Sequence, residues 1–161
     1  MITEWNNFFT ATLGGAAALT GLIFVGVSLS LTQILANSIL PDRALISLVL
    51  LLTIVIVATI FLVPKQSFHE LGGEILLIAT LVWIGITRID IDIIRKVEKQ
   101  YKNHIIMNMV FDQLAMLPYI IAGVMIITTG ESGIYWVVPA IIFSFIKAIL
   151  DAWVLLVEIH R

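Results

Sequence analysis

The feature that most constrains the fold is a run of 37 residues, from Trp5 to Pro41, without one ionisable side chain. A helix needs about 20 apolar residues to cross the ~30 Å hydrocarbon core of a bilayer, because each residue rises about 1.5 Å. The run is longer than that, and a surface helix of a water-soluble protein carries charged or polar residues on its outer face. It therefore predicts a membrane-embedded helix close to the N-terminus.

The composition of the whole chain extends this prediction beyond the first helix. Hydrophobic residues make up 60% of the 161 residues and charged residues only 12%, whereas soluble domains average about 45–50% and about 25%. Such a chain has no room for a sizeable soluble domain beside its apolar segments. We therefore expect an all-α fold, a polytopic transmembrane helical bundle that forms one domain over residues 1–161.

Apolar segments predict how many times the chain crosses the membrane. Five spans are expected, at about residues 8–35, 44–63, 71–89, 107–128 and 134–159. The third span contains Glu74 near its end, so the alternative is four spans plus one interfacial helix. Residues 88–104 alternate charge with isoleucine and predict a charged helical connector, with opposite charges four residues apart such as Asp92 and Lys96.

Lysine and arginine predict the orientation, because cytoplasmic loops are rich in them. Five spans place seven of these residues on one side of the membrane and only Lys65 on the other. We therefore expect residues 88–104 and the C-terminus in the cytoplasm and the N-terminus outside. With four spans, residues 88–104 and the C-terminus keep this placement, but the N-terminus also lies inside.

The first predicted span carries mostly small residues at alternating steps of three and four, which places them on one helix face. These residues are Ala11, Gly14, Ala18, Gly21, Val25, Ser28 and Thr32, and we call them the ladder. Small residues let membrane helices approach closely. Two interpretations stay open: helix packing within one subunit, or a subunit interface or pore lining in a homo-oligomer.

Ionisable residues inside the last two predicted spans form a candidate intramembrane polar site. Counting from the turn between these spans puts Asp112 at about the level of Asp151 and about one turn from Lys147. Gln113 and Ser144 are their polar neighbours. A charge at mid-bilayer costs roughly 2.5–3.5 kcal/mol on insertion scales, so these side chains need partners. The cluster is either a neutralising bridge that orients the two helices, or part of an ion or proton path or a site for a charged ligand.

The motifs that would indicate an enzyme are absent from the sequence. There is no cysteine, no metalloprotease, nucleophile-elbow or phosphate-loop motif, and the three histidines lie outside the predicted membrane core. We expect no cofactor, no metal site and, at a net charge of -2, no nucleic-acid partner. The expected function is that of a non-enzymatic, oligomeric integral membrane protein that binds or regulates a membrane partner. The alternative is an oligomeric ion or proton channel with a polar site in its cytoplasmic half.

Five segments of the chain carry a resemblance to known sequences: FFTATLGGAAALTGLIFVGVSLSLTQIL, LPDRA, LVPKQ, GIYWVVP and DAWVLLVEIHR. Together they resemble a family of small bacterial multi-pass membrane proteins, some of whose members are labelled modulators of the FtsH protease. The resemblance implies a location in the bacterial plasma (inner) membrane and a membrane protease as one possible class of partner. It implies no catalytic residues. The chain departs from the family at Lys147 and Asp151, where the family has small residues or an amide.

Overall fold

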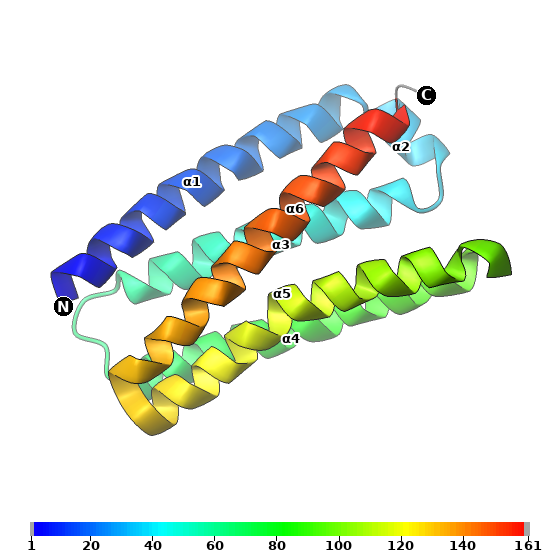
Figure 1. The fold of residues 1–161 in the computed structure, drawn as a ribbon. Coiled ribbons are helices and arrows are strands. Elements are labelled where there is room, and N and C mark those ends of the chain that lie inside the picture. Colours follow the sequence, from blue (N-terminus) through cyan, green and yellow to red (C-terminus); the bar gives the residue numbers. More distant parts are fainter. Residues whose placement is uncertain (1, 160–161) are drawn as a thin grey trace.

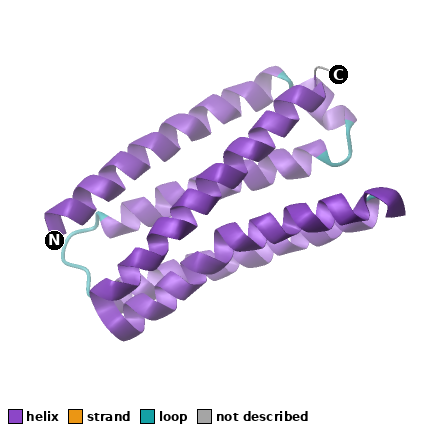
Figure 2. Ribbon diagram, in the orientation of Figure 1, coloured by secondary structure: helices purple, strands orange, loops and turns teal. Residues whose placement is uncertain are grey.

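The described part of the chain consists of helices, short turns and no strand (Figure 2). The computed structural model describes residues 2–159, with side chains from residue 5 to residue 155. The α-helices are α1 (Ile2–Leu29), α2 (Leu31–Ala36), α3 (Leu40–Phe61), α4 (Phe68–Lys96), α5 (Lys102–Thr129) and α6 (Val137–Ile159). Two 3₁₀ helices, η1 (Lys99–Tyr101) and η2 (Gly130–Trp136), flank α5. The prediction of an all-α fold is confirmed.

Helix α3 lies in the middle of the bundle and packs against α1, α4 and α6. Helices α4 and α5 lie side by side and antiparallel, and α6 crosses in front of α3 (Figure 1). Helix α1 lies at the edge, and most of its contacts are with α3. The core is therefore built by α3, α4, α5 and α6, with α1 added to one side.

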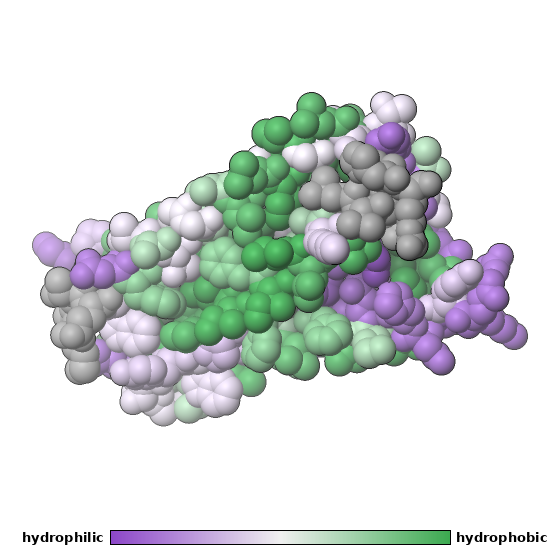
Figure 3. All heavy atoms as spheres, turned by 45° about the horizontal axis from the view of Figure 1, so that its top comes forward, coloured by the Kyte–Doolittle hydropathy of each residue, from purple (hydrophilic) through white to green (hydrophobic). Residues whose placement is uncertain are grey.

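Three stretches of the described chain are helical, long and apolar enough to cross a membrane. They are Trp5–Leu29, Leu40–Phe61 and Lys99–Leu155, the last of which includes both α5 and α6. Helix α4 is not among the stretches found within residues 2–159. The face shown in Figure 3 is hydrophobic along its middle, with hydrophilic residues gathered at its right-hand end. The structure thus fits membrane association, while the number of spans stays a prediction.

The first apolar segment is not one continuous helix, while the span over residues 8–35 stays a prediction. The chain turns at Ser30 (φ -107°, ψ 16°), and α2 begins after it. Two residues earlier, the Ser28 hydroxyl donates a hydrogen bond of 2.7 Å to the Phe24 carbonyl. Back-bonding of this kind often bends helices, and here it precedes the interruption at Ser30.

The charged connector predicted over residues 88–104 is also interrupted. Helix α4 ends at Lys96, Val97 and Glu98 are extended, and the chain then enters η1 and α5. Because α5 runs antiparallel to α4, the chain must reverse here, and a continuous helix cannot do that. The Lys96 ammonium lies 2.8 Å from an Asp42 carboxylate oxygen on α3, and Asp92 instead lies 3.6 Å from Arg95.

Helices α4 and α5 approach each other closely at two glycines. A Cβ atom on Gly72 would lie 2.7 Å from Ile127 Cγ1, and one on Gly123 would lie 2.8 Å from Leu76 Cβ. Only glycine fits this contact without movement of its neighbours. The close-packing residues within the subunit are therefore in α4 and α5, not in the ladder of α1.

Polar and aromatic contacts define the end of the bundle where α4 begins. A capping box starts α4: the Ser67 hydroxyl accepts from the Glu70 amide at 3.3 Å, and the Glu70 carboxylate accepts from the Ser67 amide at 2.9 Å. At the same end of the bundle, Trp5 meets Tyr135 edge to face with ring centroids 5.1 Å apart. Tryptophan and tyrosine are enriched at membrane–water interfaces, so this end suits one such boundary.

Candidate functional site

Lys147 lies between two carboxylates in the interior of the bundle. Its Nζ atom is 3.0 Å from Asp112 Oδ1 on α5 and donates a hydrogen bond to Asp151 Oδ2 one turn along α6. The exposed fractions are 0% for Asp112 and 4% for each of the other two residues. The ionic cluster predicted from helix depth is therefore present, and protein surrounds it on all sides.

The two polar neighbours predicted for this cluster have other partners. The Gln113 side chain accepts a hydrogen bond from the Trp83 indole and donates one of 3.2 Å to the Thr87 hydroxyl, so it joins α5 to α4. The buried Ser144 hydroxyl donates to the Ala115 carbonyl at 3.5 Å and links α6 to α5. Both residues hold helices together around the cluster and make no hydrogen bond to Lys147 within the described residues.

A third buried carboxylate, which the sequence analysis did not single out, belongs to the same layer. Asp90 on α4 is 2% exposed, while Asp92 on the same helix is exposed. A signal for this was present in the spacing, because Asp90 continues the buried stripe of Ala79, Ile86 and Ile93. The alternating charges around it indicate an exposed helix face instead.

Helix register places Asp90 near the level of Ser47 of α3. Lys96 pairs with Asp42 across antiparallel helices, so Asp90, six residues before Lys96, lies at about the level of the residue six after Asp42. That residue is Leu48, which directly follows Ser47, and the Ser47 side chain is fully buried.

The register of α6 puts Asp151 in the same layer. Leu155 packs in one buried cluster with Ala44 and Leu40 of α3, and Asp151 precedes it by one turn. Asp151 therefore lies near Ser47 as well, and one layer of the bundle receives polar side chains from all four core helices.

Several buried polar atoms of this region have no hydrogen-bond partner among the described residues. They are Asp90 Oδ2, Asp112 Oδ2, the Ser47 hydroxyl, Arg43 Nε and the Tyr119 hydroxyl. An unsatisfied buried polar group costs about 1–3 kcal/mol, and more when it is charged. Native proteins keep few of them, so this concentration marks the layer as a candidate site.

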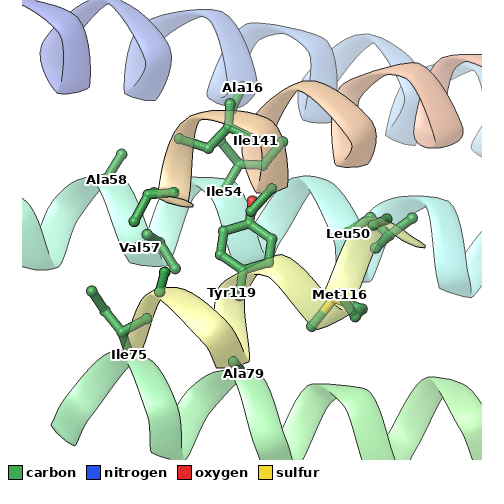
Figure 4. Packing of buried hydrophobic residues seen from close by; sticks show 14 of the residues in the cluster. Ala16, Leu50, Ile54, Val57, Ala58, Ile75, Ala79, Met116, Tyr119 and Ile141 are labelled. Carbon is green, nitrogen blue, oxygen red and sulfur yellow. The ribbon is translucent and has the colours of Figure 1, made fainter. Parts of the chain in front are cut away.

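The polar region ends at Tyr119, two turns from Asp112 towards the α5–α6 turn. Figure 4 shows the Tyr119 side chain pointing towards Ile54 of α3 and Ile141 of α6, with Val57 nearby. Beyond it the buried residues of α5 are Ala122, Gly123 and Ile126. Apolar packing thus closes the polar region on the side of the α5–α6 turn.

The ladder of α1 faces away from the bundle. All seven of its residues are exposed, whereas Phe9 and Ala16, on the opposite side of the helix, are buried. Cβ atoms built on Gly14 and Gly21 would meet nothing within 4 Å. Among the residues that the structure describes, the ladder therefore packs against no other helix.

An apolar groove runs beside the ladder, between α1 and α6. It has a volume of about 440 Å³, and its walls include Leu19, Ile23, Gly26, Trp153 and Leu155. The side chains that line it are apolar, and the ionic cluster contributes none of them. The groove and the ladder together leave α1 with two sides that the described side chains, residues 5–155, do not cover.

Comparison with known proteins finds no matching family model, no similar curated protein and no similar solved structure. The resemblance described from the sequence segments stays a prediction.

Proposed function

We propose that the chain is an integral membrane protein with five spans, embedded through α1, α3, α4, α5 and α6. Four of these helices, α1, α3, α5 and α6, belong to the three stretches that are long and apolar enough to cross a membrane, and α4 is supported by its partners. It packs along α5, and Leu77 and Leu81 on its outer face are 62% and 63% exposed. Lipid accommodates such side chains at no cost, whereas water does not. Glu74 and Arg88, which bracket this section, can extend their charges towards the two interfaces.

The orientation that we propose places the end containing Lys96 and residues 99–104 in the cytoplasm of a bacterial cell, with the protein in the plasma membrane. The positive-inside rule supports it. Arg95 and Lys99 are exposed at this end, and Lys65 lies in the turn between α3 and α4 at the other. An accessibility assay with a single cysteine at Lys99 or at Lys65 tests the orientation cleanly, because the natural chain has no cysteine. Labelling of Lys99→Cys from outside intact cells would contradict it.

The proposed role is non-enzymatic: the protein assembles with further copies of itself and binds or regulates a membrane partner, such as a membrane protease. The observation that carries the assembly is the outward direction of the ladder. Gly14, Ala18 and Gly21 offer a flat strip where a second backbone can approach, and helices in lipid associate through such contacts. No described part of the same subunit packs against that strip.

Disulfide cross-linking in native membranes tests the assembly. We expect Gly14→Cys and Gly21→Cys to form cross-linked dimers on mild oxidation. Ala16→Cys is the matched control, since Ala16 is on the same helix but fully buried against the core. Monomer from all three variants, at a protein level where the wild type migrates as an oligomer, would remove the ladder from the interface.

Recognition of the partner is tested by charge reversal at the cytoplasmic end. The variant Arg95→Glu with Lys99→Glu should lose a membrane protease that the wild type captures from native membranes. The control Lys65→Glu changes a charge at the opposite end and should keep it. Equal capture by both variants would exclude this end as the contact surface.

A second candidate function is an oligomeric ion or proton channel, favoured by the charged side chains buried in the cytoplasmic half. Within a subunit, the apolar packing beyond Tyr119 argues for a different path, between subunits and along Ser28 and Thr32 of the ladder. Flux into liposomes discriminates the two roles. A conductance that Gly21→Leu abolishes supports a path along α1, and no flux above that of empty liposomes would exclude the channel.

A further inference from the structure

The layer around Lys147 contains an unequal number of buried charges of the two signs. Asp90, Asp112 and Asp151 supply three carboxylates, and Lys147 supplies one ammonium. Arg43 on α3 is close enough for its positive charge to act on both Asp90 and Asp112. These are the titratable groups that α3, α4, α5 and α6 direct to the layer in the described chain. Fully ionised, the five groups sum to one negative charge.

The ammonium of Lys147 does not supply a partner for every carboxylate oxygen of the layer. It contacts Asp112 Oδ1 and Asp151 Oδ2, so the second oxygen of Asp112 and the Oδ2 atom of Asp90 remain without a hydrogen bond among the described residues. Both carboxylates are at least 98% buried, and the buried Ser47 hydroxyl of α3 also lacks a partner among the described residues. An isolated buried charge costs far more than an isolated surface charge, and proteins avoid it by neutralisation.

A bound metal ion is disfavoured as the neutralising charge. No group of three His, Cys, Asp or Glu side chains within the searched residues converges closely enough to hold one. The remaining main-chain oxygens of the layer belong to helices and already accept hydrogen bonds there. A proton needs only one carboxylate oxygen, and it turns an acceptor without a partner into a donor.

We propose that this layer is a proton-binding site in which Asp90 and Asp112 together hold one proton. The proton comes from water at the cytoplasmic end, adds to a carboxylate oxygen and brings the sum of the five charges to zero. The site is open to protons only from that end, because the buried residues beyond Tyr119 are apolar. It requires the core helices alone and does not depend on assembly through α1 or on any partner.

Infrared spectroscopy of the full-length protein in lipid nanodiscs tests this site. At about pH 7 ordinary Asp and Glu side chains are ionised, so a C=O stretching band of a protonated carboxylic acid reports a buried acid. We expect this band in the wild type, with a shift to lower frequency in D₂O. Asp90→Asn and Asp112→Asn should each remove it, because a single shared proton is no longer needed once one charge is gone.

Matched variants make the result specific. Asp92→Asn alters an exposed carboxylate on the same helix as Asp90 and should leave the band unchanged. Lys147→Met removes the central positive charge and should increase the band about twofold, as a second carboxylate takes up a proton. The wild-type spectrum keeps the test decisive even if Asp112→Asn does not fold. A wild type without the band at about pH 7, or a band that appears only when sodium is replaced by choline, would overturn the proposal.

Discussion

The Nζ atom of Lys147 lies 3.0 Å from Asp112 Oδ1, and this contact joins α6 to α5 across a fully buried interface. The pair is held in the section of the bundle where all four core helices meet. Its removal therefore leaves buried carboxylates without their ammonium partner.

We expect Lys147→Met to destabilise the protein by about 3–5 kcal/mol, the range found when one partner of a buried ion pair is removed. The loss arises because Asp112 and Asp151 stay buried without their cation. Unfolding in mixed detergent micelles, followed by circular dichroism, measures it. The triple variant Lys147→Met, Asp112→Asn, Asp151→Asn removes every charge of the cluster and should recover most of the stability. A triple variant as unstable as the single one would show that the loss comes from packing alone.

Glycine substitutions in α4 should distinguish a close helix contact from an open surface. We expect Gly72→Ala to cost about 1–3 kcal/mol, typical of overpacking, because the new Cβ would lie 2.7 Å from Ile127 Cγ1 and 2.9 Å from the Gly123 carbonyl oxygen. Gly73→Ala is the adjacent control, with nothing within 4 Å of its Cβ. The same unfolding assay compares them, and equal stability of the two variants would contradict the α4–α5 contact.

A large side chain on the ladder should change assembly without changing the fold. We expect Gly21→Ile to lower the oligomeric fraction at least tenfold, because a branched side chain separates two backbones that meet there. Phe24→Leu, also exposed on α1 but off the ladder, is the control. Size-exclusion chromatography with light scattering measures the mass, and circular dichroism checks that helix content is kept. An unchanged mass for Gly21→Ile would place the ladder against lipid.

The start of α4 should respond to acid through Glu70. Hydrogen bonds from the Ser67 amide and hydroxyl lower the pKa of Glu70 below its ordinary value of 4.5. Ionised Glu70 therefore contributes stability above pH 4.5, and this contribution is lost as the pH falls through the lowered pKa. Amide hydrogen exchange over the first turn of α4 should accelerate in that window for the wild type. Glu70→Gln should show faster exchange at neutral pH and no further change in the acid window.

Much of the helical fold could be predicted from the hydropathy of the sequence. The Lys147 cluster could be predicted from the depth of its three residues along α5 and α6. The apolar segments are helical in the structure. Counting a rise of about 1.5 Å per residue along α5 and α6 from the turn between them predicts that Asp112 and Asp151 lie at the same depth. Hydropathy did not predict the helix breaks at Ser30 and Val97, because these depend on where the chain must bend or reverse and not on average polarity.

The sequence alone does not predict the role of a residue when that role depends on how a neighbouring helix packs against it. Whether Asp90 is buried depends on the rotation of α4 against α5. The sequence pattern of α4 near Asp90 has polar residues on two faces of the helix, so it does not predict which face is buried. The same is true of Gly72 and Gly123, which became close contacts only through the register of the two helices. The ladder of α1 has a clear face, but its direction, inward or outward, is set by how α3 packs on Phe9 and Ala16.

The pairing of Asp112 with Lys147 also bears on how the chain enters the membrane during synthesis. Helix α5 alone would bring Asp112 into lipid without a cationic partner, at a cost of roughly 2.5–3.5 kcal/mol on translocon-insertion scales, whereas Lys147 of α6 pairs with Asp151 on its own helix. As a hairpin joined by the short η2 segment, α5 and α6 enter with the Lys147 ammonium already placed beside Asp112. The translocon would therefore release the two helices together, and the ribosome would have to complete α6 before α5 could leave for the bilayer.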